Sequence, residues 1–255
     1  MKVSLLASGS KGNSLLISCR NGHLLIDAGL SAREIVRRLE LVGVAPEELN
    51  AIFVTHEHVD HVRGLGVLSR RYRLPVYLHH ATAATLADNQ RPASLVEFET
   101  GLEVAVADLA VKAFTVTHDA EAPVGFTVTG SFGKLGIATD LGIATRLVAE
   151  ELSNCRCLVL EANHDETLLR DGPYPWPLKQ RIRGNHGHLS NVASADLLGK
   201  LCWDGLEAVF LAHLSETNNH PDLAATAARE ILGRQTCCQP ELLVGRQDRP
   251  TARSI

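Results

Sequence analysis

One short run of residues constrains this chain more than any other feature of its sequence. The run reads His56-Glu57-His58-Val59-Asp60-His61. It follows an apolar, β-branched segment, residues 51–55, that we predict to be a strand. In extended backbone His56 and His58 can turn their rings to the same side and converge on one ion, while Asp60 and His61 face a second. Imidazole and carboxylate groups favour zinc or manganese over calcium, so the run predicts a metal site of this kind. The alternative is an exposed histidine-rich turn, which further ligands elsewhere in the chain would disfavour.

Length and composition place the chain among ordinary globular proteins. It has 255 residues, 45% hydrophobic and 21% charged, and a chain of this size can bury a large core, so we expect residues 1–255 to form a single domain. The net charge of −4 argues against a whole surface built for polyanions. A short basic run at Arg70, Arg71 and Arg73 is one local candidate for a phosphate contact, but a solvated helix face is the favoured interpretation.

The cysteines and apolar segments indicate where the protein works. The chain has no CxxC pair among its six cysteines, which are Cys19, Cys155, Cys157, Cys202, Cys237 and Cys238. No apolar stretch is long enough to cross a bilayer, and the first residues lack the pattern of a secretory signal peptide. We therefore expect a cytoplasmic protein with free thiols and no membrane partner.

Most of the chain reads as strands, with helices attached to both halves. Strands are predicted at 2–7, 14–19, 23–26, 51–55, 76–79, 135–138, 157–160 and 208–211, with a β-rich stretch at 95–129. Helices are predicted at 81–87, 145–152, 192–201, 221–232 and after Ser31, where Glu34 would complete a capping box. Residues 172–177, rich in proline, read as an ordered loop, and the tail after Leu243 as frayed. This order predicts two sheets packed face to face with helices outside.

The histidine run and four further positions resemble the metallo-β-lactamase superfamily, whose hallmark is HxHxDH after a strand. In chain order these positions are Asp27 after Leu24-Leu25-Ile26, His118 in Val116-Thr117-His118-Asp119, Asp140 in Ala138-Thr139-Asp140, and His213 in Leu211-Ala212-His213-Leu214-Ser215. The resemblance covers about residues 1–220. It implies an α+β protein with the four-layer αββα metallo-β-lactamase fold, in which two facing mixed sheets carry helices outside.

The same resemblance implies a ligand set for two divalent ions. One ion would be held by His56, His58 and His118, the other by Asp60, His61 and His213, with Asp140 bridging both. Asp27 would orient the loop instead of binding an ion. The donors suit zinc or manganese, and iron as well, so the metal stays open. Taken singly, His118 or His213 at a strand end would more often be structural, but their order along the chain favours the metal site.

Two downstream segments resemble motifs of ribonuclease Z and related nucleases of the superfamily. They are Leu160-Glu161-Ala162-Asn163 and Gly187-His188-Leu189-Ser190, although Leu160 stands where those enzymes often have a histidine. The resemblance implies that Glu161, His188 and Asp60 relay a proton to the leaving oxygen of a phosphodiester, and histidine suits this because it titrates near neutral pH. In the structural alternative, Glu161 and His188 cap the helices that follow them.

The N-terminal segment from Ser8 to Ser14 reads as a hairpin turn, because its spacing does not fit a Walker loop. Its polar residues Ser8, Ser10 and Asn13 are candidates for phosphate contacts. This opening, together with Asn163-His164-Asp165 and the stretch after His213, is similar to the bacterial YycJ (WalJ) group. That group is associated with metal-dependent 5′ to 3′ exonuclease activity on double-stranded DNA and with DNA repair. The resemblance thus implies a binuclear metallohydrolase, a DNA exonuclease that attacks with a metal-bridging hydroxide.

Other classes of function stay open on the sequence. A small-molecule hydrolase acting on a thioester, lactone or cyclic nucleotide would explain the metal ligands and the acidic charge, but not Glu161 and His188. RNA processing of the ribonuclease Z kind is chemically close, yet the chain has no long Gly/Pro-rich insertion. A non-catalytic binding protein is disfavoured because all seven ligand positions are filled. The sequence predicts neither the oligomeric state, the polarity of cleavage nor partner proteins.

Overall fold

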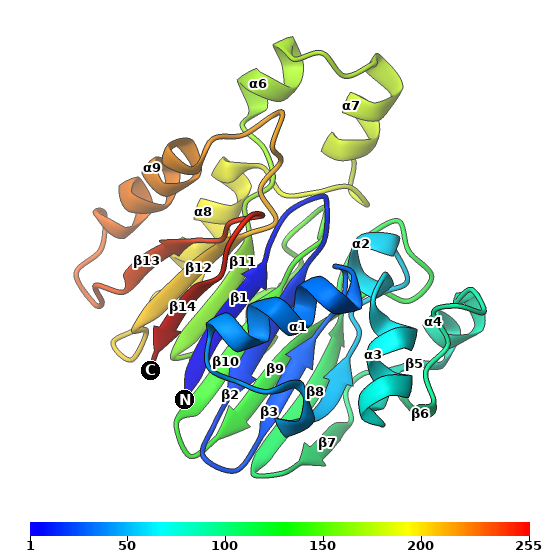
Figure 1. Cartoon of the computed structure of the whole chain (residues 1–255). Coiled ribbons are helices and arrows are strands. Elements are labelled where there is room, and N and C mark those ends of the chain that lie inside the picture. The colour runs from blue at the N-terminus through cyan, green and yellow to red at the C-terminus, as the bar shows by residue number, and fades with distance from the viewer.

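Two seven-stranded sheets form the centre of the computed structural model, which describes residues 1–255 (Figure 1). The first sheet runs, from edge to edge, β14 (Thr251–Ser254), β1 (Lys2–Ala7), β2 (Ser14–Ser18), β3 (His23–Ile26), β4 (Leu49–Phe53), β5 (Pro75–His79) and β6 (Ser94–Phe98). The second runs β13 (Glu241–Val244), β12 (Ala208–Ala212), β11 (Cys157–Glu161), β10 (Gly133–Ala138), β9 (Val124–Gly130), β8 (Leu109–Thr115) and β7 (Glu103–Val106). Both are mixed, since β3 to β6 and β10 to β13 are parallel and the other neighbours antiparallel.

The helices lie outside the two sheets, and not all of them pack on a sheet face (Figure 1). They are α1 (Ala32–Leu41), a 3-10 turn η1 (Pro46–Glu48), α2 (Val59–Val62), α3 (Leu65–Tyr72), α4 (His80–Thr85), α5 (Arg146–Glu151), α6 (Glu166–Asp171), α7 (Trp176–Arg183), α8 (Asn191–Leu201) and α9 (Pro221–Leu232). One buried cluster joins α1 and α3 to the first sheet, and another joins α5, α8 and α9 to the second. The predicted four-layer αββα arrangement is therefore confirmed. No helix has the length and apolarity needed to span a membrane.

The main core lies between the two sheets. Phe53 of β4 meets Phe126 of β9 edge to face, with ring centroids 5.7 Å apart, and both are almost completely buried. Phe210 of β12 belongs to the same cluster. Burial of each such ring contributes roughly 1.5–3 kcal/mol relative to exposure. These contacts fix the position of one sheet relative to the other.

Strand register brings the site residues to a common edge. Among the parallel strands, Ile26 is opposite Phe53 in the first sheet, and in the second Glu161 is opposite Ala212. Parallel strands end at the same edge of a sheet, so the residues that follow them gather there. The loops after β3, β4, β8, β10 and β12, together with the last residue of β11, form this edge.

Two expectations about chain segments are wrong. The tail after Leu243 is not frayed, because β14 pairs with β1, with Lys2 opposite Ser254, and the two chain ends exchange backbone hydrogen bonds. The proline-rich segment is a loop only as far as Pro175, since Trp176 begins α7 and Pro177 fits its first turn.

The predicted capping box at the start of α1 is half formed. Ser31 Oγ accepts a hydrogen bond from the backbone N–H of Glu34, as predicted. The Glu34 carboxylate, however, accepts from Arg37 and Arg38 instead of turning back to the Ser31 backbone. Two guanidinium donors are stronger partners than one exposed amide, because both members of each pair are charged.

Candidate metal centre

All seven predicted ligands meet at the edge where the parallel strands end. His56 and His58 lie in the loop after β4, Asp60 and His61 in α2, His118 after β8, Asp140 after β10, and His213 after β12. Five of them are buried, and only His58 and Asp60 are partly exposed. Segments from both sheets therefore supply the same site.

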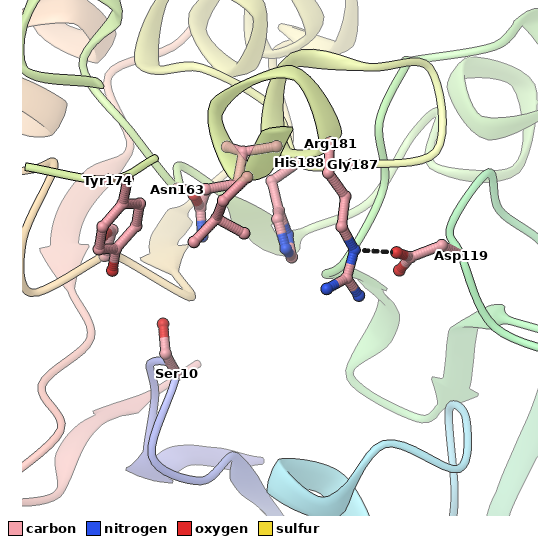
Figure 2. A pocket seen from close by; sticks show the side chains of 10 residues that line it. Ser10, Asp119, Asn163, Tyr174, Arg181, Gly187 and His188 are labelled. Atoms are coloured by element: carbon pink, nitrogen blue, oxygen red, sulfur yellow. Dashed lines mark hydrogen bonds and ion pairs between the residues drawn. The ribbon is translucent and has the colours of Figure 1, made fainter. Parts of the chain in front are cut away.

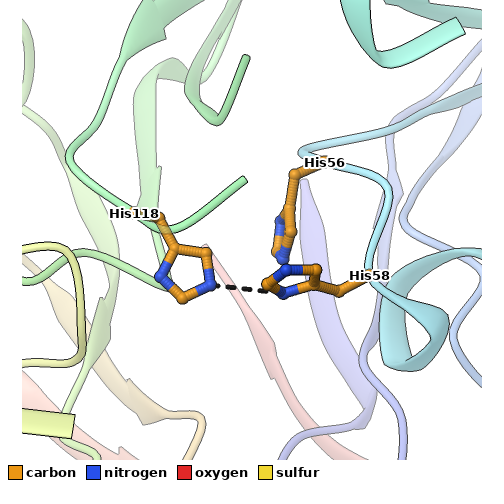
Figure 3. Close-up of side chains that lie close together, drawn as sticks. All are labelled: His56, His58 and His118. Carbon is orange, nitrogen blue, oxygen red and sulfur yellow. Dashed lines mark hydrogen bonds between the residues drawn. The ribbon is translucent and has the colours of Figure 1, made fainter. Parts of the chain in front are cut away.

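His56, His58 and His118 form one triangle of rings (Figure 3). Their potential ligand atoms all lie within 4.8 Å of one another, and His118 Nε2 is 3.3 Å from His58 Nδ1. Burial, reinforced by the neighbouring histidines, holds the pKa of His56 well below its ordinary value. Burial likewise lowers the pKa of His118. Both rings are thus neutral, which is the form of imidazole that binds metal.

Asp60, His61 and His213 form a second group beside the first. Asp60 Oδ2 lies 3.5 Å from His61 Nε2 and 3.6 Å from His213 Nε2. Burial opposes ionisation of Asp60, but the nearby imidazoles of His213 and His61 outweigh it and hold the pKa of Asp60 far below its usual range. The group therefore offers one carboxylate and two imidazoles.

Asp140 reaches both groups. Its Oδ2 lies 3.4 Å from His61 Nε2, and its Oδ1 lies 3.9 Å from His118 Nε2. Oδ1 also lies 3.3 Å from His213 Nδ1, so this carboxylate is near residues of both ligand groups and is placed where it could contact two ions.

The donors fit two divalent cations on two further grounds. Among the ligand residues, three buried atoms have no hydrogen-bond partner in the protein, namely His56 Nε2, Asp140 Oδ2 and His213 Nε2. Such an atom costs about 1–3 kcal/mol unless something binds it. In addition, burial lowers the pKa of His213, but Asp140, Asp60 and Glu161 raise it by more, to about 10. The carboxylates thus hold negative charge that bound cations would balance.

Asp27 holds His61 in place from behind. Asp27 Oδ2 lies 2.8 Å from His61 Nδ1, and Asp27 Oδ1 accepts from the backbone N–H of Thr55. A hydrogen bond at Nδ1 selects the tautomer whose Nε2 is free for a metal. Thr55, which the sequence marked only as a strand residue, also donates its hydroxyl to Asp27.

Glu161, which is buried, and His188, which is half-buried, form a pair next to the predicted ligands. Glu161 Oε1 lies 2.7 Å from His188 Nδ1 and 3.0 Å from His213 Nδ1. Burial opposes ionisation of Glu161, but His188 and His213 outweigh it and lower its pKa. Neither residue caps a helix, since Asp165 caps α6 and Ser190 caps α8. The structural alternative for this pair is therefore wrong.

The three N-terminal candidates for phosphate contacts differ in their surroundings. Ser8 Oγ accepts from the backbone N–H of His213, and Asn13 Nδ2 lies 3.3 Å from Asp60 Oδ2. Both are buried and support the ligands, whereas Ser10 is exposed and lines the cavity over them. The basic run lies elsewhere: Arg70 donates to the backbone carbonyls of Asn89 and Arg91 on the surface.

Sequence reasoning missed the residues that α7 and its preceding loop bring to the site. A cavity of about 210 Å³ covers the ligands, and Arg181 of α7 lines it together with His188. Arg181 Nε donates to Asp119, the neighbour of His118 (Figure 2). Tyr174 lines the adjoining space. No motif marks these residues, since the Arg181–Asp119 pair joins positions far apart in the chain.

Comparisons with known proteins agree with this geometry. Residues 23–213 match the model of the beta-lactamase superfamily domain. The chain is 37% identical over 229 residues to exodeoxyribonuclease WalJ of Streptococcus pneumoniae serotype 2, covering 88% of this chain and 85% of that protein. It is 35% identical over 235 residues to exodeoxyribonuclease YycJ of Bacillus anthracis, covering 91% and 89%.

A solved structure shows the same architecture. The metallo-beta-lactamase fold protein YhfI from Bacillus subtilis matches with a TM-score of 0.74 at 16% identity, and 98% of each chain is covered. The predicted fold, the resemblance and the hydrolase class are confirmed, and the family implies divalent metal ions, for which the His/Asp groups are candidate sites. The chain belongs to the β-lactamase superfamily.

Proposed function

We propose that the protein is a metal-dependent phosphodiesterase, a 5′ to 3′ exonuclease that acts on double-stranded DNA in the cytoplasm. The observation that carries this proposal is the Glu161–His188 pair, 2.7 Å between Oε1 and Nδ1, beside the metal ligands. A nucleoside 3′ oxygen leaves poorly unless it is protonated, whereas the thiolate of a thioester leaves without such a donor. The relatives named exodeoxyribonuclease support DNA as the substrate.

The ligand groups would hold two divalent ions, zinc or manganese. Bound there, the ions would lower the pKa of a water molecule and offset charge on the phosphate. The triangle of His56, His58 and His118 would hold one ion, and Asp60, His61 and His213 the other, with Asp140 between them.

The chain's own side chains would move the protons. Glu161 accepts from His188 Nδ1 and so directs the other ring nitrogen, Nε2, to the substrate. His188 then donates a proton to the leaving 3′ oxygen as the P–O3′ bond breaks. Asp60 is ionised in the folded protein and would take part with Glu161 and His188 in the relay of this proton to the leaving oxygen. Asp27 orients His61 throughout.

A substrate panel tests the proposal. Purified protein is incubated with Mn²⁺ or Zn²⁺ and with 5′-labelled duplex DNA, 3′-labelled duplex DNA, a tRNA precursor, and a set of thioesters, lactones and cyclic nucleotides. We expect the 5′ label to appear at once as a mononucleotide, while the 3′ label stays on strands that shorten stepwise. Hydrolysis of an ester or of tRNA alone, with no nucleotide released from DNA with either metal, would contradict the proposed exonuclease activity.

A further inference from the structure

A second cavity opens beside the metal centre. Its volume is about 190 Å³, and it lies between the N-terminal loop and the segment that leads into α7. Figure 2 shows Ser10 on one side of this space and Tyr174 on the other, with Arg181 and His188 at its margin. We call it the side cavity.

The side cavity and the cavity over the metal ligands share part of their walls. Ser10, Arg181 and His188 line both. Arg181 is held at this boundary by Asp119, and a guanidinium there can contact a phosphate. A phosphodiester whose phosphorus lies over the ligands therefore places one of its two flanking nucleosides in the side cavity.

The walls of the side cavity suit a nucleoside. Tyr174, Leu178 and Ile182 give it an apolar wall, and Ser10 and Ser215 give it hydroxyl groups. Tyr174 is half-buried, and its side chain lines the cavity. Proline on both sides of Tyr174 restricts the backbone, so little conformational freedom is lost when a base stacks on the ring.

The position of His188 decides which nucleoside enters. In the proposed reaction a water oxygen bonds to phosphorus, the P–O3′ bond breaks, and the 3′ oxygen takes its proton from His188. The nucleoside that carries this oxygen must therefore face His188, which lines the side cavity. We propose that the side cavity holds the terminal nucleoside of the DNA strand, the one that cleavage releases, with its base against the ring of Tyr174. This inference rests on the proposed exonuclease activity.

Deleting the base and the ring separately and together tests the inference. The substrates are 5′-phosphorylated, 3′-labelled duplexes whose first nucleotide is either intact or an abasic tetrahydrofuran residue. The rate of the first cleavage is measured for wild type and Tyr174→Ala with manganese. Two controls flank the test: Trp176→Ala, an aromatic residue that is 66% exposed on the same segment, and a duplex with the abasic residue at its third position. Tyr174→Phe keeps the ring and should behave as wild type.

We expect the terminal abasic residue to slow wild type by about 10-fold or more, as loss of one stacked base does. Tyr174→Ala should lose a similar factor on intact DNA and nothing further on abasic DNA, because both changes remove the same contact. If wild type cleaves both duplexes equally fast, or if the two losses multiply, the inference is wrong while the exonuclease stands. If wild type cleaves no DNA, the proposed function fails and the inference fails with it.

Discussion

Three residues of the candidate metal centre have a left-handed backbone conformation. Asp27, Asp140 and His213 have φ of 60°, 57° and 56°, and none of them is a glycine. A non-glycine residue in this region costs about 1–2 kcal/mol, and such residues cluster at functional sites. Each one follows the end of a strand, so the turn that leaves the sheet also directs the side chain into the site.

Replacement of His188 distinguishes a role in proton transfer from a role in metal binding. We predict that His188→Ala slows DNA cleavage by about 10²- to 10⁴-fold, the usual contribution of a general acid, while metal content stays at the wild-type level. His186→Ala, an exposed histidine two positions away, is the matched control and should change neither. If the His188 variant lost metal, His188 would be a ligand instead.

His164 gives the folded protein a pH dependence. It follows β11, is 3% exposed, and burial lowers its pKa from 6.5 to about 4. Between these values the unfolded chain binds a proton that the folded protein does not, so stability is full above pH 6.5 and is lost as pH falls toward 4. Over this interval the free energy of unfolding should fall by about 2–3 kcal/mol more in wild type than in His164→Asn. Urea unfolding at a series of pH values measures this, and parallel curves would contradict it.

At the scale of elements, α1 is hydrogen-bonded to the C-terminal segment through Arg38. Arg38 is buried, and its Nη1 donates to the backbone carbonyls of Leu6 and Gln247 at 2.8 and 2.9 Å. Arg38→Met would leave both carbonyls without this donor, and we predict a loss of about 2 kcal/mol or more in the free energy of unfolding.

Arg37→Met is the matched control, because Arg37 is half-exposed and shares the Glu34 partner. An exposed ion pair of this kind contributes at most about 1 kcal/mol. Denaturant unfolding of the two variants gives the comparison. Equal losses would show that Arg38 acts through Glu34 alone and not through the C-terminal segment.

Local sequence predicted the elements whose pattern matches their burial. The strands that end at the metal centre could be predicted because they are apolar. The ligands in the histidine run could be predicted because HxHxDH has a fixed spacing. By contrast, α7 buries no residue and shows no apolar stripe, so neither the helix nor Arg181 could be read from it. Residues 251–254 form a strand only because β1 lies beside them, and no local pattern records that pairing.

At the scale of the whole molecule, we propose that residues 1–255 form one domain. The core between the sheets joins Val3 and Phe53 to Phe126 and Phe210, so both halves of the chain share it. Unfolding should then be one cooperative transition. Far-UV circular dichroism and the fluorescence of Trp176 and Trp203 should give the same denaturant midpoint. Two separate transitions would show that the halves are independent.

We propose above all that the two halves of the molecule together hold two divalent ions. This proposal is tested most directly by counting metal. Wild type and Asp140→Ala are saturated with Zn²⁺ or Mn²⁺, freed of unbound metal by gel filtration, and analysed by inductively coupled plasma mass spectrometry. We predict two ions per chain in wild type and fewer than two in the variant, because Asp140 faces both ligand groups. A wild-type protein without metal, or a variant with both ions in place, would contradict the account.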